Sequence, residues 1–138
     1  MANNSVFIVD DDPVFRTVFD KLLARHDYKN VMHFTSGEEC LSELTKNSNK
    51  PSLIFLDFSM QGMNGLDVLQ RIKLISKKIK VAIVTSIDSQ ELRDRCMASG
   101  AFSYINKNDL AARISPLVAT NKKGIFSSLL DLSRLSMN

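Results

Sequence analysis

Acidic, hydroxyl and ammonium side chains follow short apolar runs at several points in this 138-residue chain. Three consecutive aspartates, at positions 10 to 12, come directly after the first run, and Asp57 follows the third. Thr85 and Lys107 follow the fourth and the fifth. If these groups converge, the carboxylates cannot all stay ionised without a cation, and oxygen ligands favour Mg²⁺. Lys107 and Thr85 suit phosphoryl oxygens, so the residues indicate phosphoryl transfer to one aspartate.

The elements that must position these groups alternate along the chain. Five short runs rich in β-branched or aromatic residues predict strands at Val6–Val9, Val31–Phe34, Leu53–Leu56, Val81–Val84 and Phe102–Ile105. The stretches between them have helical spacing, and such alternation implies an α/β fold with helices on both faces of a parallel sheet. His33 and Ser103 favour edge positions for the second and fifth runs. We therefore expect a doubly wound five-stranded parallel sheet with strand order 2-1-3-4-5.

Local signals predict where several helices begin and end. Asp12 is the expected N-cap of the first helix, and Pro13 suits its first turn. Ser36–Glu39 reads as a capping box at the start of the second helix. The fifth helix is expected to begin near Asp109. Because Pro116 interrupts its pattern, we expect it to be short, kinked or split.

The predicted sheet brings the chemical groups to one edge. Ligands of open parallel sheets bind outside the carboxyl ends of the strands, where the strand order reverses. In the expected order the first and third strands are neighbours at the centre. The carboxylates of Asp10, Asp11 and Asp57, the hydroxyl of Thr85 and the ammonium of Lys107 are then expected to converge there.

Four segments in this order resemble the receiver domain of two-component response regulators, namely Phe7–Pro13, Leu56–Gly65, Val84–Ser86 and Tyr104–Lys107. The resemblance covers about residues 5–120 and implies a flavodoxin/CheY-like fold. It divides the chain into a receiver domain at residues 1–121 and a C-terminal tail at 122–138. The apolar spacing of the tail predicts an amphipathic helix, packed on the domain or facing a partner.

The resemblance implies a metal site and a phosphoacceptor. Asp57 would accept the phosphoryl group. Asp11 would ligate Mg²⁺ directly, and Asp10 directly or through water. The carboxylate of Asp57 and the backbone carbonyl of Ser59 would also be ligands, and Mn²⁺ could substitute for Mg²⁺.

The resemblance also implies a switch. Lys107 would bind the phosphoryl group, and the hydroxyl of Thr85 would move toward it. Tyr104 would be the aromatic rotamer switch coupled to Thr85. The alternative for Tyr104 is ordinary half-buried packing on an edge strand. Ser86 is small, as the family requires for access to Asp57.

Two positions depart from the family pattern. Gln61 and Asn108 stand where the family usually has proline. The family's Lys-Pro bond is often cis, whereas a cis bond before a residue other than proline costs about 3–4 kcal/mol. We therefore expect a trans bond after Lys107, or a relaxed loop. The fourth helix, fifth strand and fifth helix commonly form the family's output face, so Pro116 falls within that surface.

Composition excludes several other classes of protein. Lys and Arg number 18 and Asp and Glu 15, and a net charge of +3 is too small to indicate nucleic-acid binding. No apolar run approaches the roughly 18 residues of a membrane helix, and the N-terminus does not resemble a signal peptide. Cys40 and Cys96 fit reduced core thiols, which favours a cytoplasmic protein.

These observations predict a signalling module rather than an enzyme. The chain is expected to accept phosphate from a sensor histidine kinase or a phosphotransfer protein and to change its affinity for a downstream protein. Its only catalysis would be its own phosphorylation and dephosphorylation. About 18 residues after position 120 cannot form an output domain. We expect a monomer or weak dimer with no nucleic-acid or membrane partner.

Two alternatives were weighed against this interpretation. Residues 10–14 also fit the D-x-D-x-V pattern of haloacid-dehalogenase-type phosphatases, with Asp10 as the nucleophile. That family needs an acidic pair beyond the lysine, which is missing here, and Asp57 would have no role. A flavodoxin-like cofactor site needs a donor-rich loop after the first strand, where three aspartates would repel a phosphate.

Overall fold

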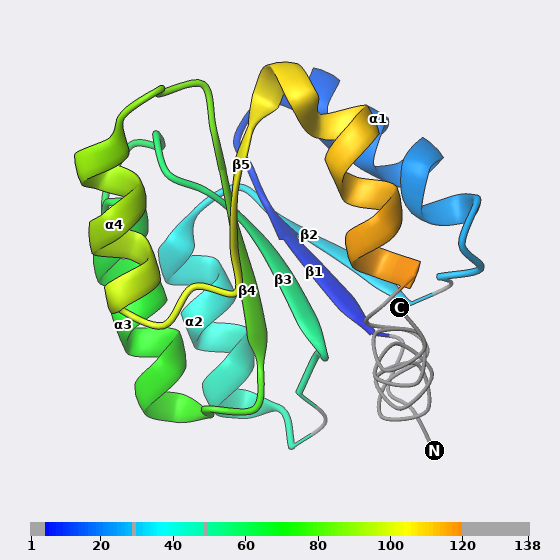
Figure 1. The fold of residues 1–138 in the computed structure, drawn as a ribbon. Coiled ribbons are helices and arrows are strands. Elements are labelled where there is room, and N and C mark those ends of the chain that lie inside the picture. Colours follow the sequence, from blue (N-terminus) through cyan, green and yellow to red (C-terminus); the bar gives the residue numbers. More distant parts are fainter. Residues whose placement is uncertain (1–4, 29, 49, 120–138) are drawn as a thin grey trace, which may run out of the picture.

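The computed structural model describes residues 5–28, 30–48 and 50–119. Its five strands are β1 (Val6–Val9), β2 (Val31–Phe34), β3 (Leu53–Asp57), β4 (Lys80–Thr85) and β5 (Ser103–Asn106). They form one sheet in the order β2-β1-β3-β4-β5, and all four pairings are parallel. The predicted order is confirmed, with His33 and Ser103 on the two edge strands (Figure 1).

The helices are α1 (Pro13–Ala24), α2 (Gly37–Lys46), α3 (Gly65–Ile75) and α4 (Gln90–Ala98), followed by the 3-10 turn η1 (Lys107–Asp109) and a helix over residues 110–119. Asp12 caps α1 as predicted, because its carboxylate accepts a hydrogen bond from the amide of Val14 at 2.9 Å. Ser36 caps α2 by accepting from the Glu39 amide. The Glu39 carboxylate bonds to Thr35.

Alternate residues of each strand face opposite layers of the core. Phe7 and Val9 face the layer formed by α2, α3 and α4, whereas Val6 and Ile8 face α1 and the helix over 110–119. Figure 1 shows these two layers on either side of the sheet. Cys40 and Cys96 lie in the first layer with no solvent exposure, as expected of core thiols. The sheet is therefore covered on both faces, and its strand ends are left to carry the site.

Of the short, kinked or split forms expected for the fifth helix, the split form is wrong, because residues 110–119 form one helical run that includes Pro116. Pro116 is solvent-exposed, so its ring can occupy the outer face without displacing core side chains. The peptide bond after Lys107 is trans, as expected, and η1 occupies this loop. The boundary at residue 121 and the helix expected in the tail at 122–138 lie outside the described residues and stay predictions.

Candidate functional site

The first part of the site is the segment that leaves β1. Asp10 is 1% exposed, and its backbone is fixed on both sides. Its amide donates to the carbonyl of Phe34 at 3.0 Å, and its carbonyl accepts from the guanidinium of Arg16 at 2.8 Å. One carboxylate oxygen, Oδ1, accepts from the Asp12 amide at 2.8 Å, whereas Asp11 faces solvent. The strand end therefore presents one buried and one exposed carboxylate side by side.

Asp57 is the last residue of β3, the strand that pairs with β1. Its side chain is 4% exposed. Oδ1 accepts a hydrogen bond from the Ser59 amide at 3.1 Å, and Oδ2 accepts one from the Lys107 ammonium at 3.3 Å. Each oxygen thus has one donor, which fixes the carboxylate at the end of the strand.

Lys107 links the two aspartates. Its Nζ lies 3.2 Å from Oδ2 of Asp10 and 3.3 Å from Oδ2 of Asp57. Burial by itself lowers the pKa of Lys107, but the charges of Asp57 and Asp10 and the hydrogen bonds to them outweigh that effect and raise it. The ammonium therefore stays charged between two buried carboxylates.

The carboxylates form a group suited to a hard cation. One oxygen from each of Asp10, Asp11 and Asp57 lies within 4.8 Å of the other two. Burial, together with the charge of Asp10, raises the pKa of Asp57 to about 6, against the lowering effects of the Ser59 amide and Lys107. Oδ2 of Asp10 is buried, and the Lys107 ammonium lies 3.2 Å from it. Three carboxylates and one ammonium leave an excess of negative charge, which fits Mg²⁺ or Mn²⁺.

A chain of hydrogen bonds leads from the site toward β5. Thr85, at the end of β4, is fully buried, and its hydroxyl oxygen accepts from the Ile87 amide at 3.1 Å. The carbonyl of Ile87 accepts from the Tyr104 hydroxyl at 2.8 Å. Tyr104 is 3% exposed rather than half-buried, because α4 covers it and the Arg93 guanidinium lies 4.8 Å from its ring centroid.

The structure brings together four of the side chains that the sequence placed at this edge, and three further residues contact the predicted ones. Asp10, Asp11, Asp57 and Lys107 share one cluster, and Thr85 ends the neighbouring strand. The additions are Phe15, whose ring centroid lies 4.1 Å from Nζ of Lys107, Arg16 and Arg93. The sequence did not identify these three residues, because helical periodicity shows whether a residue lies on an apolar or a solvated face of its helix but not which side chain from another element it contacts.

Comparison with known proteins assigns the family. Residues 6–117 match the family described as "Response regulator receiver domain". The chain belongs to that family. The fold, the strand order and the family resemblance predicted from the sequence are thereby confirmed. The matches give no support to the haloacid-dehalogenase alternative.

Curated relatives and solved structures agree with this assignment. Sporulation initiation phosphotransferase F of Bacillus subtilis is 28% identical over 107 residues, which are 78% of this chain and 84% of the relative. Response regulator GacA of Pseudomonas aeruginosa is 30% identical over 103 residues, 74% of this chain and 47% of GacA. A DNA-binding response regulator of the LuxR family from Staphylococcus aureus superposes with a TM-score of 0.70 at 25% identity, over 83% of this chain and 92% of that one.

The relatives differ in how much of their length this receiver domain represents. The chain spans about half of several curated relatives, with shares of 50%, 48% and 47% in three of them. Among residues 5–28, 30–48 and 50–119, the helices lack the length and apolarity that crossing a membrane requires. The expected cytoplasmic location and the absence of a nucleic-acid partner stay predictions.

Proposed function

We propose that this receiver domain accepts a phosphoryl group on Asp57 from a phosphohistidine of a sensor kinase or a phosphotransfer protein. The observation that carries the proposal is the setting of the Asp57 carboxylate. It is buried at the end of a central strand, contacts an ammonium at 3.3 Å and lies in a group of three carboxylates. The pKa of about 6 leaves this carboxylate mainly ionised at neutral pH, as a nucleophile must be.

The proposed step exchanges one bond to phosphorus for another. A carboxylate oxygen of Asp57 forms the new P–O bond, and the P–N bond to the donor imidazole breaks. The electron pair of that bond stays on the imidazole nitrogen, and the product is an acyl phosphate. Lys107 already donates to Oδ2 of Asp57, so its ammonium is placed to neutralise a phosphoryl oxygen as charge builds up.

The carboxylates of Asp10, Asp11 and Asp57 are the proposed ligands of Mg²⁺, together with the carbonyl of Ser59 that the family resemblance implies. Mn²⁺ could take the same place. When bound, the cation would supply positive charge toward the phosphoryl oxygens. The donor set supports this assignment, because three carboxylates lie within 4.8 Å of one another and the Lys107 ammonium contacts only Asp10 and Asp57 among them.

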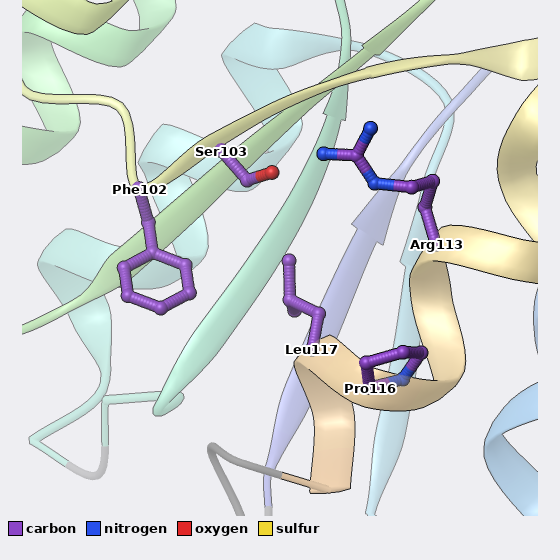
Figure 2. A pocket seen from close by; sticks show the side chains of 5 residues that line it. All are labelled: Phe102, Ser103, Arg113, Pro116 and Leu117. Atoms are coloured by element: carbon purple, nitrogen blue, oxygen red, sulfur yellow. The ribbon is translucent and has the colours of Figure 1, made fainter. Parts of the chain in front are cut away.

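We further propose that Thr85 and Tyr104 transmit the modification to a downstream protein. A shift of the Thr85 hydroxyl toward the phosphoryl group would break its bond with the Ile87 amide and loosen the Ile87 carbonyl that holds Tyr104. The proposed docking surface is the groove beside β5, of about 260 Å³, shown in Figure 2. It is lined by Phe102, Ser103, Arg113, Pro116 and Leu117.

The test is phosphorylation by phosphoramidate with Mg²⁺, read on a phosphate-affinity gel. Asp57→Asn should abolish the label, and Asp11→Ala should weaken it. The matched control is Asp12→Asn, which removes a neighbouring carboxylate but keeps a good helix cap. Label that survives Asp57→Asn and disappears in Asp10→Asn would favour a phosphatase-type nucleophile and refute the proposal.

The readout of the switch is hydrogen exchange over residues 86–104. Phosphoramidate with Mg²⁺ should change exchange of these amides in the wild type and in Asp12→Asn but leave it unchanged in Asp57→Asn. Unchanged exchange in fully labelled wild-type protein would contradict the proposed route through Thr85 and Tyr104.

A further inference from the structure

Lys107 has a third neighbour besides its two carboxylates. The ring centroid of Phe15 lies 4.1 Å from Nζ, which is well within the range of a cation–π contact. Asp10 and Asp57 approach the same nitrogen at 3.2 and 3.3 Å. The ammonium is therefore held by three groups that come from α1 and from the ends of β1 and β3.

The backbone around Lys107 leaves its side chain to be oriented from elsewhere. Lys107 begins the three-residue turn η1, whose cap is the side chain of Asn106, accepting from the Asn108 amide at 2.9 Å. This turn fixes the main chain, but a lysine side chain has four flexible carbons and a freely rotating ammonium. The carboxylates of Asp10 and Asp57 attract the ammonium, but by themselves they do not determine the direction from which Nζ of Lys107 approaches them.

Phe15 is anchored well enough to supply that orientation. It lies in the first turn of α1, a helix whose start is fixed by the Asp12 cap and by Pro13. Its partly buried ring packs against the core layer formed by α1 and the helix over 110–119. An aromatic face attracts a cation but accepts no strong hydrogen bond, so the N–H groups of Lys107 stay available to the carboxylates.

We propose that Phe15 is a positioning residue for Lys107, holding the ammonium by a cation–π contact at the point where the phosphoryl group arrives. The inference rests on the proposed function, because it assigns Lys107 a phosphoryl oxygen to bind. Phe15 itself touches neither donor nor metal in this role. Phe15 restricts the positions that the Lys107 ammonium can occupy beside the incoming phosphoryl group.

The kinetic test uses phosphoramidate, so that no partner protein contacts Phe15. Phe15→Leu keeps an apolar side chain but removes the ring, and we expect phosphorylation of Asp57 to slow by about 3- to 20-fold. Phe15→Tyr restores the aromatic face and should stay within about 2-fold of the wild type. Equal losses for the two variants, or no loss in Phe15→Leu, would overturn the inference.

The matched control is Phe19→Leu, the same substitution one turn further along α1. Phe19 is 1% exposed, and its ring packs on Phe55 with centroids 5.0 Å apart. This variant should lose stability but keep the phosphorylation rate of the folded protein within about 2-fold. A rate loss in Phe19→Leu equal to that in Phe15→Leu would show that core packing, rather than the contact with Lys107, sets the rate.

A spectroscopic test works without activity, because the chain contains no tryptophan. Phe15→Trp places a single indole against Lys107, and its emission should differ between that variant and one that also carries Lys107→Met. Adding phosphoramidate and Mg²⁺ should change the emission only where Lys107 is present. Identical spectra in both backgrounds would refute the contact, whereas label surviving Asp57→Asn would refute the proposed function instead.

Discussion

The strand-end cluster around Asp57 and the groove beside β5 are built on opposite principles. The cluster is charged and mostly buried, with the side chains of Asp10 and Asp57 only 1% and 4% exposed, and Asp11 alone of its carboxylates faces solvent. The groove is open, with Phe102 at 42% exposure and Arg113 facing solvent. Buried charges interact strongly because little water screens them, whereas exposed apolar surface gains most when a partner covers it. The contrast fits a domain that reacts at one place and is recognised at another.

Two hydrogen bonds in series run from Thr85, at the end of β4, to Tyr104 in β5, and they form the proposed connection between these regions. The Ile87 amide donates to Thr85, and the Ile87 carbonyl accepts from Tyr104. The groove includes Ser103, the residue directly before Tyr104 in β5. A change in the cluster should therefore alter the rate of phosphorylation, and a change along the connection should alter the lifetime or the consequences of the modification with little effect on that rate.

The largest expected effect comes from removing the Lys107 ammonium, which contacts both Asp10 and Asp57. Lys107→Met leaves two buried carboxylates without their ammonium and should slow phosphorylation by phosphoramidate by about 100-fold or more. The rate is read from time courses on a phosphate-affinity gel. Lys50→Met, on the loop after α2, is the control. A loss under about 3-fold would show that Lys107 contributes little to the cluster.

Without a metal ion, the free energy of unfolding should reflect the burial of the Asp57 carboxylate and its repulsion by Asp10. Burial and the charge of Asp10 raise the pKa of Asp57 from 3.8 to about 6, so the folded protein binds this proton more tightly than the unfolded chain. The cost of ionising Asp57 grows as pH rises from about 4 to about 6 and is constant above that range. In EDTA, Asp57→Asn should therefore be more stable near neutral pH by about 1–3 kcal/mol.

The same gain should shrink as pH falls below about 6 and vanish near pH 4, where the carboxyl group is protonated in both states. Urea unfolding followed by circular dichroism measures the free energy at each pH. A gain that persists unchanged at pH 4 would point to packing rather than charge.

The lifetime of the modification should depend on Ile87, the middle residue of the connection. Ile87 is 37% exposed and lies two residues beyond Thr85, so its apolar side chain offers no group to position an attacking water. Ile87→Glu should speed hydrolysis of the acyl phosphate by up to about 10-fold. Decay of the labelled protein after removal of phosphoramidate gives the rate, with Ile87→Gln as the uncharged control. Slower decay in Ile87→Glu would contradict this account.

The smallest effect is expected at Tyr104. Tyr104→Phe removes the hydroxyl that donates to the Ile87 carbonyl and should cost about 1 kcal/mol of stability. Phosphorylation by phosphoramidate should stay within about 2-fold of the wild type, because the cluster itself is untouched. Hydrogen exchange at residues 86–89 should rise in the variant. A large loss of phosphorylation in Tyr104→Phe would contradict the separation between the cluster and the groove.

Much of this arrangement could be predicted from residue types alone. His33 and Ser103 marked the edge strands because buried strands carry apolar residues on both faces, and the common doubly wound order with those edges made β1 and β3 neighbours. Once β1 and β3 were adjacent, the meeting of Asp10 and Asp57 followed from topology. The trans bond after Lys107 followed equally directly from the absence of proline at position 108.

The contacts between a helix residue and a side chain at a strand end could not be predicted. Periodicity placed Phe15 on an apolar face but could not show that its ring reaches Lys107, 92 residues further along the chain. Periodicity also allowed a split at Pro116, whereas residues 110–119 form one helical run in which this exposed proline removes one amide donor. Tyr104 is more buried than its position on an edge strand suggests, because Arg93 of α4 lies over its ring and this contact between two elements cannot be read from the sequence of either one.

The two buried thiols have a practical consequence for testing these ideas. Both natural cysteines lie in the core layer under α2 and α4 with no exposed surface, and burial raises the pKa of Cys40 to about 12 and that of Cys96 in the same direction. Thiolate is the form that attacks a maleimide, so neither cysteine should react while the protein is folded. A probe attached through Phe102→Cys would therefore label the groove alone, without a cysteine-free background.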